Sequence, residues 1–331
     1  MTAAPATAAD PAAERRALLA GAALLDRSDA GRLRLGGADR ARFLHGLVTC
    51  EVKALAEGDG AYGFLTSVQG RVLADLVVLA LGDDLWLEVP EGERQAVADH
   101  LAKYLIADRV QIAALHAVPL SLAGPRAGEL LEARIGRGGL PGEPWAHRPI
   151  ELAGVAARIV RRGVAPVETF DLWLPPGGGP EVAAHLTADG AVPVSGDAWD
   201  VLRVERGVPA FGPDFGPETF PQETGLEEAA VSYSKGCYLG QEIVARIHYR
   251  GGVQRGLRGV RFADAGAPPS SGTPLLAEGR PAGTVGTSVL SPDHGPIALA
   301  ILHHRAGAPG TVLELAAGGR AEVVALPFVS G

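Results

Sequence analysis

Residues 233–249 read Tyr-Ser-Lys-Gly-Cys-Tyr-Leu-Gly-Gln-Glu-Ile-Val-Ala-Arg-Ile-His-Tyr, and this stretch carries most of what the sequence says about fold and function. Ala, Gly, Arg and Pro dominate the chain, whereas Lys occurs three times, Cys twice and Tyr five times. The stretch contains one of the Lys, one of the Cys and three of the Tyr. When a few residue types dominate a whole sequence, a cluster of rare types indicates positions where function requires those particular side chains. We therefore expect a functional site here.

The first half of the stretch has the features of a reactive thiol. We expect a helix to begin near Tyr238, which places Cys237 at its N-terminus, where backbone N–H groups and the helix dipole favour a thiolate. Lys235 adds positive charge, and Gly236 and Gly240 allow another backbone or a ligand to approach closely. The alternative is a buried, inert cysteine. The neighbouring Lys and Gly residues favour the functional interpretation.

The second half of the stretch supplies polar side chains. Gln241 and Glu242 bring an amide and a carboxylate. Glu242 and Arg246 are spaced i,i+4, so that they can pair on one face of a helix. Cys50 follows an apolar segment, and we interpret it as structural. A disulfide between Cys50 and Cys237 is not expected in a reducing cytoplasm.

The composition limits the class of protein. A chain of 331 residues with 47% hydrophobic and 21% charged residues is typical of two or three globular domains. A net charge of −8 gives no basic field for nucleic acid or an anionic membrane, and two cysteines exclude a disulfide scaffold. No apolar run reaches the roughly 18–20 residues that span a membrane. We expect a cytoplasmic monomer in which residues 1–20 are disordered.

The pattern of apolar residues divides the chain into two parts. Residues 61–89 are typical of a β-meander, and amphipathic helices are expected on either side of it. Toward the C-terminus the sequence changes to short alternating apolar runs between Gly/Pro turns, which predicts a small β-barrel or sandwich. We therefore expect a domain of two α+β subdomains over residues 21–255 and a barrel over residues 256–331.

The sequence lacks the motifs of several common active sites. There is no C-x-x-C or H-E-x-x-H spacing, no P-loop and no G-x-S-x-G, and we assign no metal site. Two carboxylates remain as candidates. Asp75 falls inside an apolar strand, where a charge is costly unless it is paired or serves a ligand. Glu205 ends a predicted helix beside Arg203 and Arg206, where a solvated ion pair is the alternative to a ligand contact.

The segment 235–246 resembles the K-G-C-[FY]-x-G-Q-E motif and the Arg that follows it in the YgfZ family. The residues that carry the resemblance are Lys235, Gly236, Cys237, Tyr238, Gly240, Gln241, Glu242 and Arg246. Further segments resemble the family, so that the likeness extends from about residue 22 to the end. The family comprises folate-binding proteins related to the glycine-cleavage T-protein, which is an aminomethyltransferase, and to mitochondrial iron–sulfur assembly factors.

This resemblance implies an α+β fold of the T-protein type, with packed subdomains around a central cavity and a C-terminal antiparallel β-barrel. It implies tetrahydrofolate or a one-carbon derivative as cofactor. Asp75, Glu205 and Arg246 would contact the folate, with Glu205 on the amino-pyrimidine edge of the pterin. Iron–sulfur client enzymes or assembly proteins are the implied partners, and Cys237 with Lys235 would supply a redox or transfer function.

One position departs from the T-proteins, which carry an Asp-Asp pair whose first member acts near the folate N5. Here that position is Ala74, and only Asp75 remains, although a shift of one residue in register would reverse this interpretation. We therefore expect a folate-binding accessory protein in iron–sulfur cluster assembly or repair rather than a true aminomethyltransferase. The alternatives are an aminomethyltransferase or demethylase of the T-protein type, and a scaffold that binds no folate.

Overall fold

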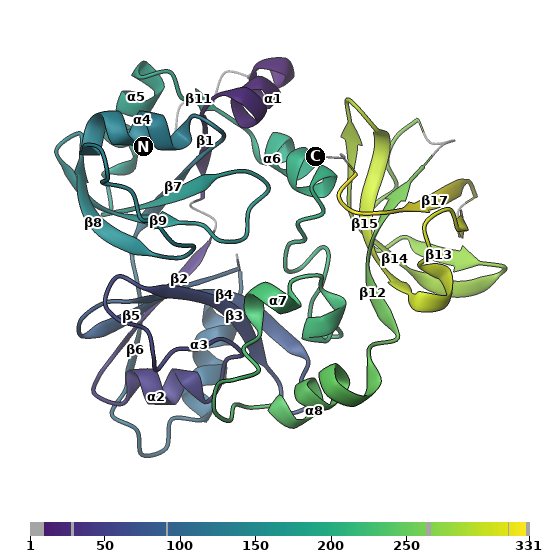
Figure 1. The fold of residues 1–331 in the computed structure, drawn as a ribbon, viewed down its shortest axis with the longest axis horizontal. Helices are drawn as coiled ribbons and strands as arrows, with labels where there is room; N and C mark the ends of the chain where they lie inside the picture. The colour runs from purple at the N-terminus through teal and green to yellow at the C-terminus, as the bar shows by residue number, and fades with distance from the viewer. Residues whose placement is uncertain (1–9, 28–29, 91, 263–265, 317, 329–331) are drawn as a thin grey trace.

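The computed structural model describes residues 10–27, 30–90, 92–262, 266–316 and 318–328. Figure 1 shows two lobes of mixed helix and sheet, one above the other, and a β-barrel beside them. The three parts contain one sheet each, of five strands, six strands and a closed barrel of six. Over the described ranges, no helix is both long and apolar enough to cross a membrane.

The first lobe is an antiparallel sheet with helices on one face. Its elements are β2 (Gly31–Gly36), α2 (Arg40–His45), β3 (Gly60–Thr66), β4 (Val72–Ala80), β5 (Asp84–Val89), α3 (Arg94–Lys103) and β6 (Gln111–Ala114). The strand order is β3-β4-β5-β2-β6, and the meander predicted over residues 61–89 is confirmed. One face of β4 packs on α2 and α3, and the other faces the second lobe. This double burial explains its nearly continuous apolar sequence.

The second lobe is a six-stranded sheet with buried central strands. Its elements are α1 (Pro11–Ala20), β1 (Ala23–Asp26), β7 (Val118–Ala123), α4 (Ala127–Ile135), β8 (His147–Leu152), β9 (Val155–Arg161), β10 (Thr169–Leu174), α5 (Gly179–Ala188), β11 (Val192–Pro193) and α6 (Gly196–Glu205). The strand order is β11-β1-β7-β10-β9-β8. Every residue of β10 is buried, because α4 and α5 cover one face and the first lobe covers the other.

The C-terminal part is a closed antiparallel barrel, as the sequence predicts. Its strands are β12 (Arg255–Arg261), β13 (Pro274–Ala277), β14 (Arg280–Ser291), β15 (Gly295–His303), β16 (Val312–Leu315) and β17 (Arg320–Val324), with a single turn of 3-10 helix, η3 (His304–Ala306). They close in the order β12-β15-β14-β13-β16-β17. The α+β fold with a C-terminal β-barrel is therefore confirmed.

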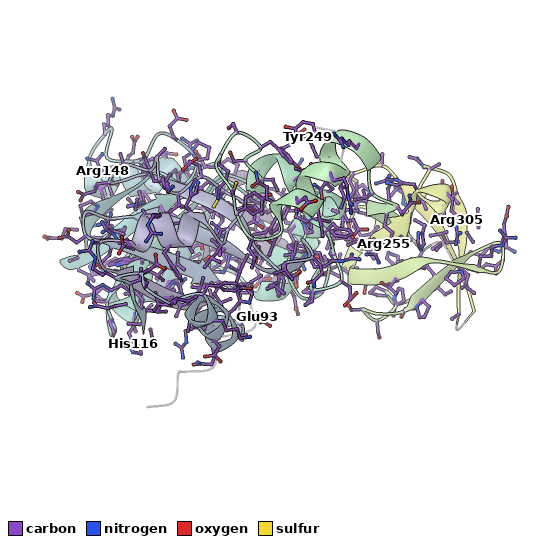
Figure 2. The ribbon with its side chains drawn as sticks, turned by 90° about the horizontal axis from the view of Figure 1, so that it is seen from below. Glu93, His116, Arg148, Tyr249, Arg255 and Arg305 are labelled. Carbon is purple, nitrogen blue, oxygen red and sulfur yellow. The ribbon has the colours of Figure 1, made fainter. Side chains whose placement is uncertain are left out.

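A connecting segment joins the second lobe to the barrel. It contains η1 (Pro221–Glu223), α7 (Glu227–Ala230), α8 (Gln241–Arg246) and the π-helical turn η2 (Ile247–Gly251). This segment carries the sequence stretch 233–249 past the first lobe. Figure 2 shows Tyr249 projecting from the surface of this segment, and Arg255 where the chain enters the barrel. α6 packs against β14 and β15, so the barrel also contacts the second lobe directly.

The prediction of disorder over residues 1–20 is wrong for residues 11–20, which form α1. Asp10 caps this helix by accepting a hydrogen bond from the N–H of Ala12, and Pro11 occupies the first turn, where proline is favoured. Leu18 is buried against Leu202 of α6. The Ala/Pro-rich composition hid these two local signals. Residues 1–9 lie outside the described part of the chain.

Candidate functional site

Lys235 connects the motif to the end of helix α2. Its ammonium donates hydrogen bonds to the carbonyl oxygens of His45 at 2.7 Å, Val48 at 2.6 Å and Cys50 at 2.8 Å. Three carbonyls at the C-terminal end of a helix are an anionic environment, which favours a cation. Burial lowers the pKa of Lys235 to about 8, so the group remains charged at neutral pH. Its three donors are therefore occupied by backbone carbonyls, and Lys235 anchors this segment to the first lobe.

The residues around Lys235 fix the same segment to the first lobe. The N–H of Leu239 donates to the carbonyl of Gly46 at 2.9 Å, and the hydroxyl of Thr66 donates to the carbonyl of Leu239 at 2.6 Å. Gly240 has φ +82°, and a Cβ there would lie 2.4 Å from the carbonyl oxygen of Ser67 in the β3–β4 turn. Gly240 is therefore required both by backbone conformation and by close approach.

Two further motif residues have structural roles. Tyr238 is buried, with its ring 5.0 Å from the ammonium of Lys235, and its hydroxyl has no partner in the described structure. Gln241 accepts a hydrogen bond from the backbone N–H of Tyr238 at 3.3 Å. At Gly236 an added Cβ would meet only the His45 ring, at 3.5 Å. Most of the motif therefore positions a loop.

Cys237 is the motif residue that this loop presents to solvent. Its thiol is free and exposed, whereas Cys50 is buried, and burial raises the pKa of the Cys50 thiol to about 12. The structural interpretation of Cys50 is confirmed. The expectation that Cys237 begins a helix is wrong, because α8 begins at Gln241 after the left-handed Gly240.

Glu242 and Arg246 do not pair in the part of the chain that the structure describes, so the predicted i,i+4 ion pair is wrong. Arg246 is exposed and lines a cavity of 510 Å³ between the β3–β4 turn, α8 and the start of the barrel. Arg71 and Arg255 line the same cavity. Arg246 is therefore in a different cavity from Asp75.

Asp75 lines a cavity of 410 Å³ between the two lobes and the segment after α6, which we call the central cavity. Its carboxylate accepts a hydrogen bond of 2.7 Å from the hydroxyl of Tyr62. The Tyr62 ring stacks on Trp145, with centroids 5.6 Å apart and planes inclined by 15°. Phe211 adds a further aromatic wall. An acceptor beside flat apolar surfaces suits a planar heterocycle with N–H donors.

The environment of Asp75 favours its protonated form. Burial raises its pKa, while the Tyr62 hydrogen bond and the charge of Arg162 oppose that rise. A carboxyl group in a cavity whose pKa is raised holds its proton to a higher pH than a free carboxyl group does, which suits a general acid or base. Asp75 is therefore the best candidate for acid–base chemistry among the described residues of the cavity.

Ala74 faces the opposite side of β4. It is completely buried in the first-lobe core with Leu65 and Leu76. The β3–β4 pairing is regular from Gly60 opposite Leu79 to Leu65 opposite Ala74, so neighbouring Ala74 and Asp75 face opposite sides of the sheet. A carboxylate at position 74 would point into this core. The expectation that Ala74 deprives the cavity of its catalytic acid is therefore wrong, because Asp75 is the residue that faces the cavity. The presence of Ala74 is then no argument against an aminomethyltransferase.

A buried ion network supports the wall behind Asp75. Glu88 of β5 accepts from Arg32 of β2 at 2.8 Å and from Arg162 at 2.6 Å. Arg162 also donates to Asp171 of β10 at 2.8 Å, and Ser121 donates to the other oxygen of Asp171 at 2.5 Å. The network crosses from the first lobe to the second. Residues of both lobes therefore fix the position of the cavity wall behind Asp75.

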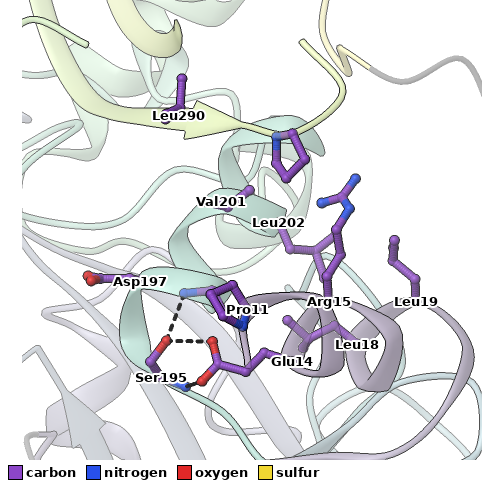
Figure 3. Close-up of a pocket in the computed structure, with 12 residues that line it drawn as sticks. Pro11, Glu14, Arg15, Leu18, Leu19, Ser195, Asp197, Val201, Leu202 and Leu290 are labelled. Carbon is purple, nitrogen blue, oxygen red and sulfur yellow. Dashed lines mark hydrogen bonds between the residues drawn. The ribbon is translucent and has the colours of Figure 1, made fainter. Parts of the chain in front are cut away.

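Glu205 lies outside the central cavity. Its carboxylate accepts from Arg15 at 3.1 Å and from Ser291 at 2.6 Å, and it is 1% exposed. Arg15 and Leu290 line a separate pocket of 390 Å³ between α1, α6 and β14, shown in Figure 3. The carboxylate is thus fully used within the protein. The structure does not support Glu205 as a pterin contact.

Sequence reasoning missed the residues that surround Asp75. Tyr62 is one of only five tyrosines, and its rarity was a usable signal. Trp145 and Arg162 come from the other lobe and have no local pattern that links them to Asp75. Among the described residues, no group of three or more His, Cys, Asp or Glu is placed to hold a metal ion.

Comparison with known proteins gives a family. The model of the GCVT N-terminal domain matches residues 5–235. The chain belongs to the GCVT family. The aminomethyltransferase of Moorella thermoacetica is 30% identical over 320 residues, covering 93% of this chain and 86% of that protein. The aminomethyltransferase of Saccharopolyspora erythraea is 28% identical over 330 residues, covering 96% and 89%.

A solved GCVT structure agrees with this assignment. The glycine cleavage system aminomethyltransferase T of Bartonella henselae superimposes with a TM-score of 0.83 at 26% identity, covering 96% of this chain and 89% of that one. A chloroplastic protein of Arabidopsis thaliana, named only as a transferase, is 30% identical over 267 residues. That match covers 80% of this chain but only 61% of the relative's length. The chain therefore has a GCVT fold with aminomethyltransferase-like relatives.

Proposed function

We propose that this GCVT-family protein binds a reduced folate in the central cavity and acts as a YgfZ-type accessory protein in iron–sulfur cluster assembly or repair. The observation that carries the proposal is the arrangement of the motif. Lys235, Gly240 and Gln241 hold the loop in place, and the Cys237 thiol on that loop is exposed.

The central cavity fits a folate on three counts. Its volume of 410 Å³ is within the range of small-molecule sites, roughly 300–1,000 Å³. Tyr62, Trp145 and Phe211 offer flat apolar surfaces for a pterin. The oxygen of Asp75 that Tyr62 leaves free would accept from the N–H donors of the amino-pyrimidine. A bound tetrahydrofolate would supply one-carbon chemistry at its N5 and N10 atoms.

Equilibrium titration with tetrahydrofolate tests this part. We expect binding by the wild type and a loss of about tenfold or more in affinity for Asp75→Ala, because a hydrogen-bonding acceptor in the cavity is removed. Glu181→Gln, an exposed carboxylate change on α5, is the matched control and should bind as the wild type does. Wild-type protein that binds no reduced folate contradicts the proposal.

Complementation of an iron–sulfur enzyme deficiency tests the accessory role. Cys237→Ala should abolish rescue while the protein remains folded, because only the exposed thiol is removed. Cys50→Ala is the paired control for loss of a cysteine. Full rescue by Cys237→Ala would sink the accessory role without affecting the folate proposal.

The second candidate is aminomethyl transfer to folate, and the position of Asp75 favours it. Asp75 presents a carboxyl group with a raised pKa to the cavity, as proton transfer requires. Incubation with tetrahydrofolate and an aminomethylated lipoyl carrier should then release ammonia. Absence of ammonia above background removes this candidate.

The remaining expectations complete the proposal. We propose iron–sulfur client enzymes or assembly proteins as partners, a cytoplasmic location and a monomeric state. Light scattering at micromolar concentration measures the last directly, and a mass near 34.0 kDa is the expected result.

A further inference from the structure

The geometry points to Arg27 as a residue that binds a ligand carboxylate in the central cavity. This inference rests on the proposed function, because it concerns the same cavity, and it names a second chemical group of the ligand beyond the one that meets Asp75.

Three arginines line the central cavity, and two of them are fully engaged. Arg162 donates to Glu88 and Asp171. Arg203 donates to Asp200 at 2.6 Å, and both Arg162 and Arg203 are almost completely buried. Arg203 also donates to Asp214 at 2.7 Å and to Thr287 at 2.6 Å. The donors of these two guanidinium groups are therefore used by partners within the protein and hold the cavity wall together.

Arg27 is the third arginine, and its guanidinium has no acceptor in the described part of the chain. Its backbone is fixed, because its N–H donates to the carbonyl of Pro119 at 3.1 Å just after β1. The side chain is partly exposed in the cavity wall. Arg27 thus combines a fixed backbone with an unused fork of donors.

Glu88, the acid whose pKa the charge of Arg27 helps to lower, is already hydrogen-bonded to two other arginines. Glu88 accepts from Arg162 with one oxygen and from Arg32 with the other. Burial would raise the pKa of Glu88, but Arg162, Arg32 and Arg27 together lower it to about 2. The charge of Arg27 therefore acts on Glu88 without a hydrogen bond between the two side chains in the described part of the chain. Its donors remain available to a ligand.

Carboxylate is the group that matches such a donor fork, because it accepts two parallel N–H bonds from guanidinium. The cavity therefore presents an acceptor at Asp75 and an anion-binding cation at Arg27. A ligand that fits both carries N–H donors and a carboxylate. Two sources have this chemistry: the glutamate tail of the folate, and a small amino-acid-like reactant bound beside it.

Binding measurements with three probes separate these sources. The probes are tetrahydrofolate, tetrahydropteroate, which lacks the glutamate, and N-methylglycine added to folate-saturated protein. Arg27→Gln should weaken at least one carboxylate-bearing probe by about tenfold or more, because a charge-assisted bidentate contact is lost. Weakening of tetrahydrofolate alone assigns the tail, and weakening of N-methylglycine alone assigns the second reactant.

Two further variants serve as controls for these binding measurements. Arg27→Lys keeps the positive charge but loses the paired N–H donors of the guanidinium. Its affinity for the carboxylate-bearing probe should lie between those of the wild type and Arg27→Gln. Arg280→Gln, an exposed arginine on the barrel strand β14, should change nothing. Equal thermal midpoints establish that each variant folds.

The inference is overturned if Arg27→Gln binds every probe as the wild type does. It is also overturned if Arg27→Gln loses as much affinity for tetrahydropteroate as for tetrahydrofolate, since Arg27 then does not recognise a carboxylate. Protein that binds neither folate is assayed with N-methylglycine alone. In that case the proposed function fails, and equal or absent binding by wild type and Arg27→Gln removes Arg27 as well.

Discussion

The ammonium of Lys235 lies 2.6 Å from the carbonyl oxygen of Val48, a residue 187 positions earlier in the chain. This contact joins the stretch 233–249 to the segment that follows helix α2 in the first lobe. The motif Lys is thereby a fixed point of the fold, while the thiol two residues later remains exposed.

Lys235→Met should destabilise the protein by about 2–4 kcal/mol, because three buried carbonyls lose their common donor while the side-chain volume is kept. Urea unfolding at pH 7 measures the change. Lys103→Met on the exposed side of α3 is the control and should leave the midpoint within error. An unchanged midpoint for Lys235→Met would contradict the assigned role.

Gly240→Ala and Gly252→Ala form a matched pair. Both glycines have positive φ, but a Cβ meets the Ser67 carbonyl at 2.4 Å in the first and nothing within 4 Å in the second. Gly252→Ala should cost about 1–3 kcal/mol from backbone conformation alone, because φ 65° and ψ 163° is a region that essentially only glycine adopts. Gly240→Ala should cost clearly more, and should increase hydrogen exchange at the Leu239 amide. Equal costs would show that the motif loop is not tightly docked.

Asp75→Asn should lower folate affinity and raise stability at neutral pH. The folded protein holds the Asp75 proton more tightly than the unfolded chain, whose pKa is near 3.8. Wild-type stability therefore falls as pH rises from 3.8 through the raised pKa, and Asn is spared this loss. Thermal midpoints of the two proteins should converge in acid and diverge toward pH 7. A variant less stable than wild type at pH 7 speaks against this account.

Glu88→Gln should destabilise the protein by about 3–5 kcal/mol at pH 7, because two buried guanidinium groups lose their shared carboxylate. The pKa of Glu88 is lowered to about 2 from 4.5, so its stabilisation is present above pH 4.5 and is lost as pH falls toward 2. Unfolding experiments across this interval should show the gap between the two proteins closing. Glu129→Gln, in an exposed pair with Arg126, is the control.

Thiol titration with a coloured disulfide reagent should find one reactive cysteine in the native protein and two after denaturation. Cys237 is exposed, whereas Cys50 is buried with the pKa of its thiol raised to about 12. Cys237→Ser should remove the fast reaction completely. Rapid reaction of both thiols in the native state would mean that the Cys50 region opens readily.

Local patterns predicted the fold well. Alternation and turn residues located the β3–β4–β5 meander and the barrel, because pairing partners there are close in sequence. Asp75 stood out as a carboxylate within an apolar strand. These signals depend only on neighbours along the chain.

Long-range partners set the limit of prediction. The three carbonyl partners of Lys235 lie 185–190 residues away, so no local pattern shows that its ammonium fixes the motif to the first lobe. The partners of Glu205, Arg15 and Ser291, are 190 and 86 residues away, so no local pattern shows that its carboxylate is occupied. The side of β4 that faces the cavity depends on how the second lobe packs against the sheet, which no local pattern shows.

The shared carboxylate of Glu88 has a consequence for selectivity. Apolar packing alone would let two lobes slide over one another by small steps, but an acid bonded at once to Arg32 and Arg162 is satisfied at one spacing only. These hydrogen bonds therefore fix the distance between the two lobes that form the walls of the central cavity. We therefore expect the thickness of a ligand to limit which molecules fit the central cavity.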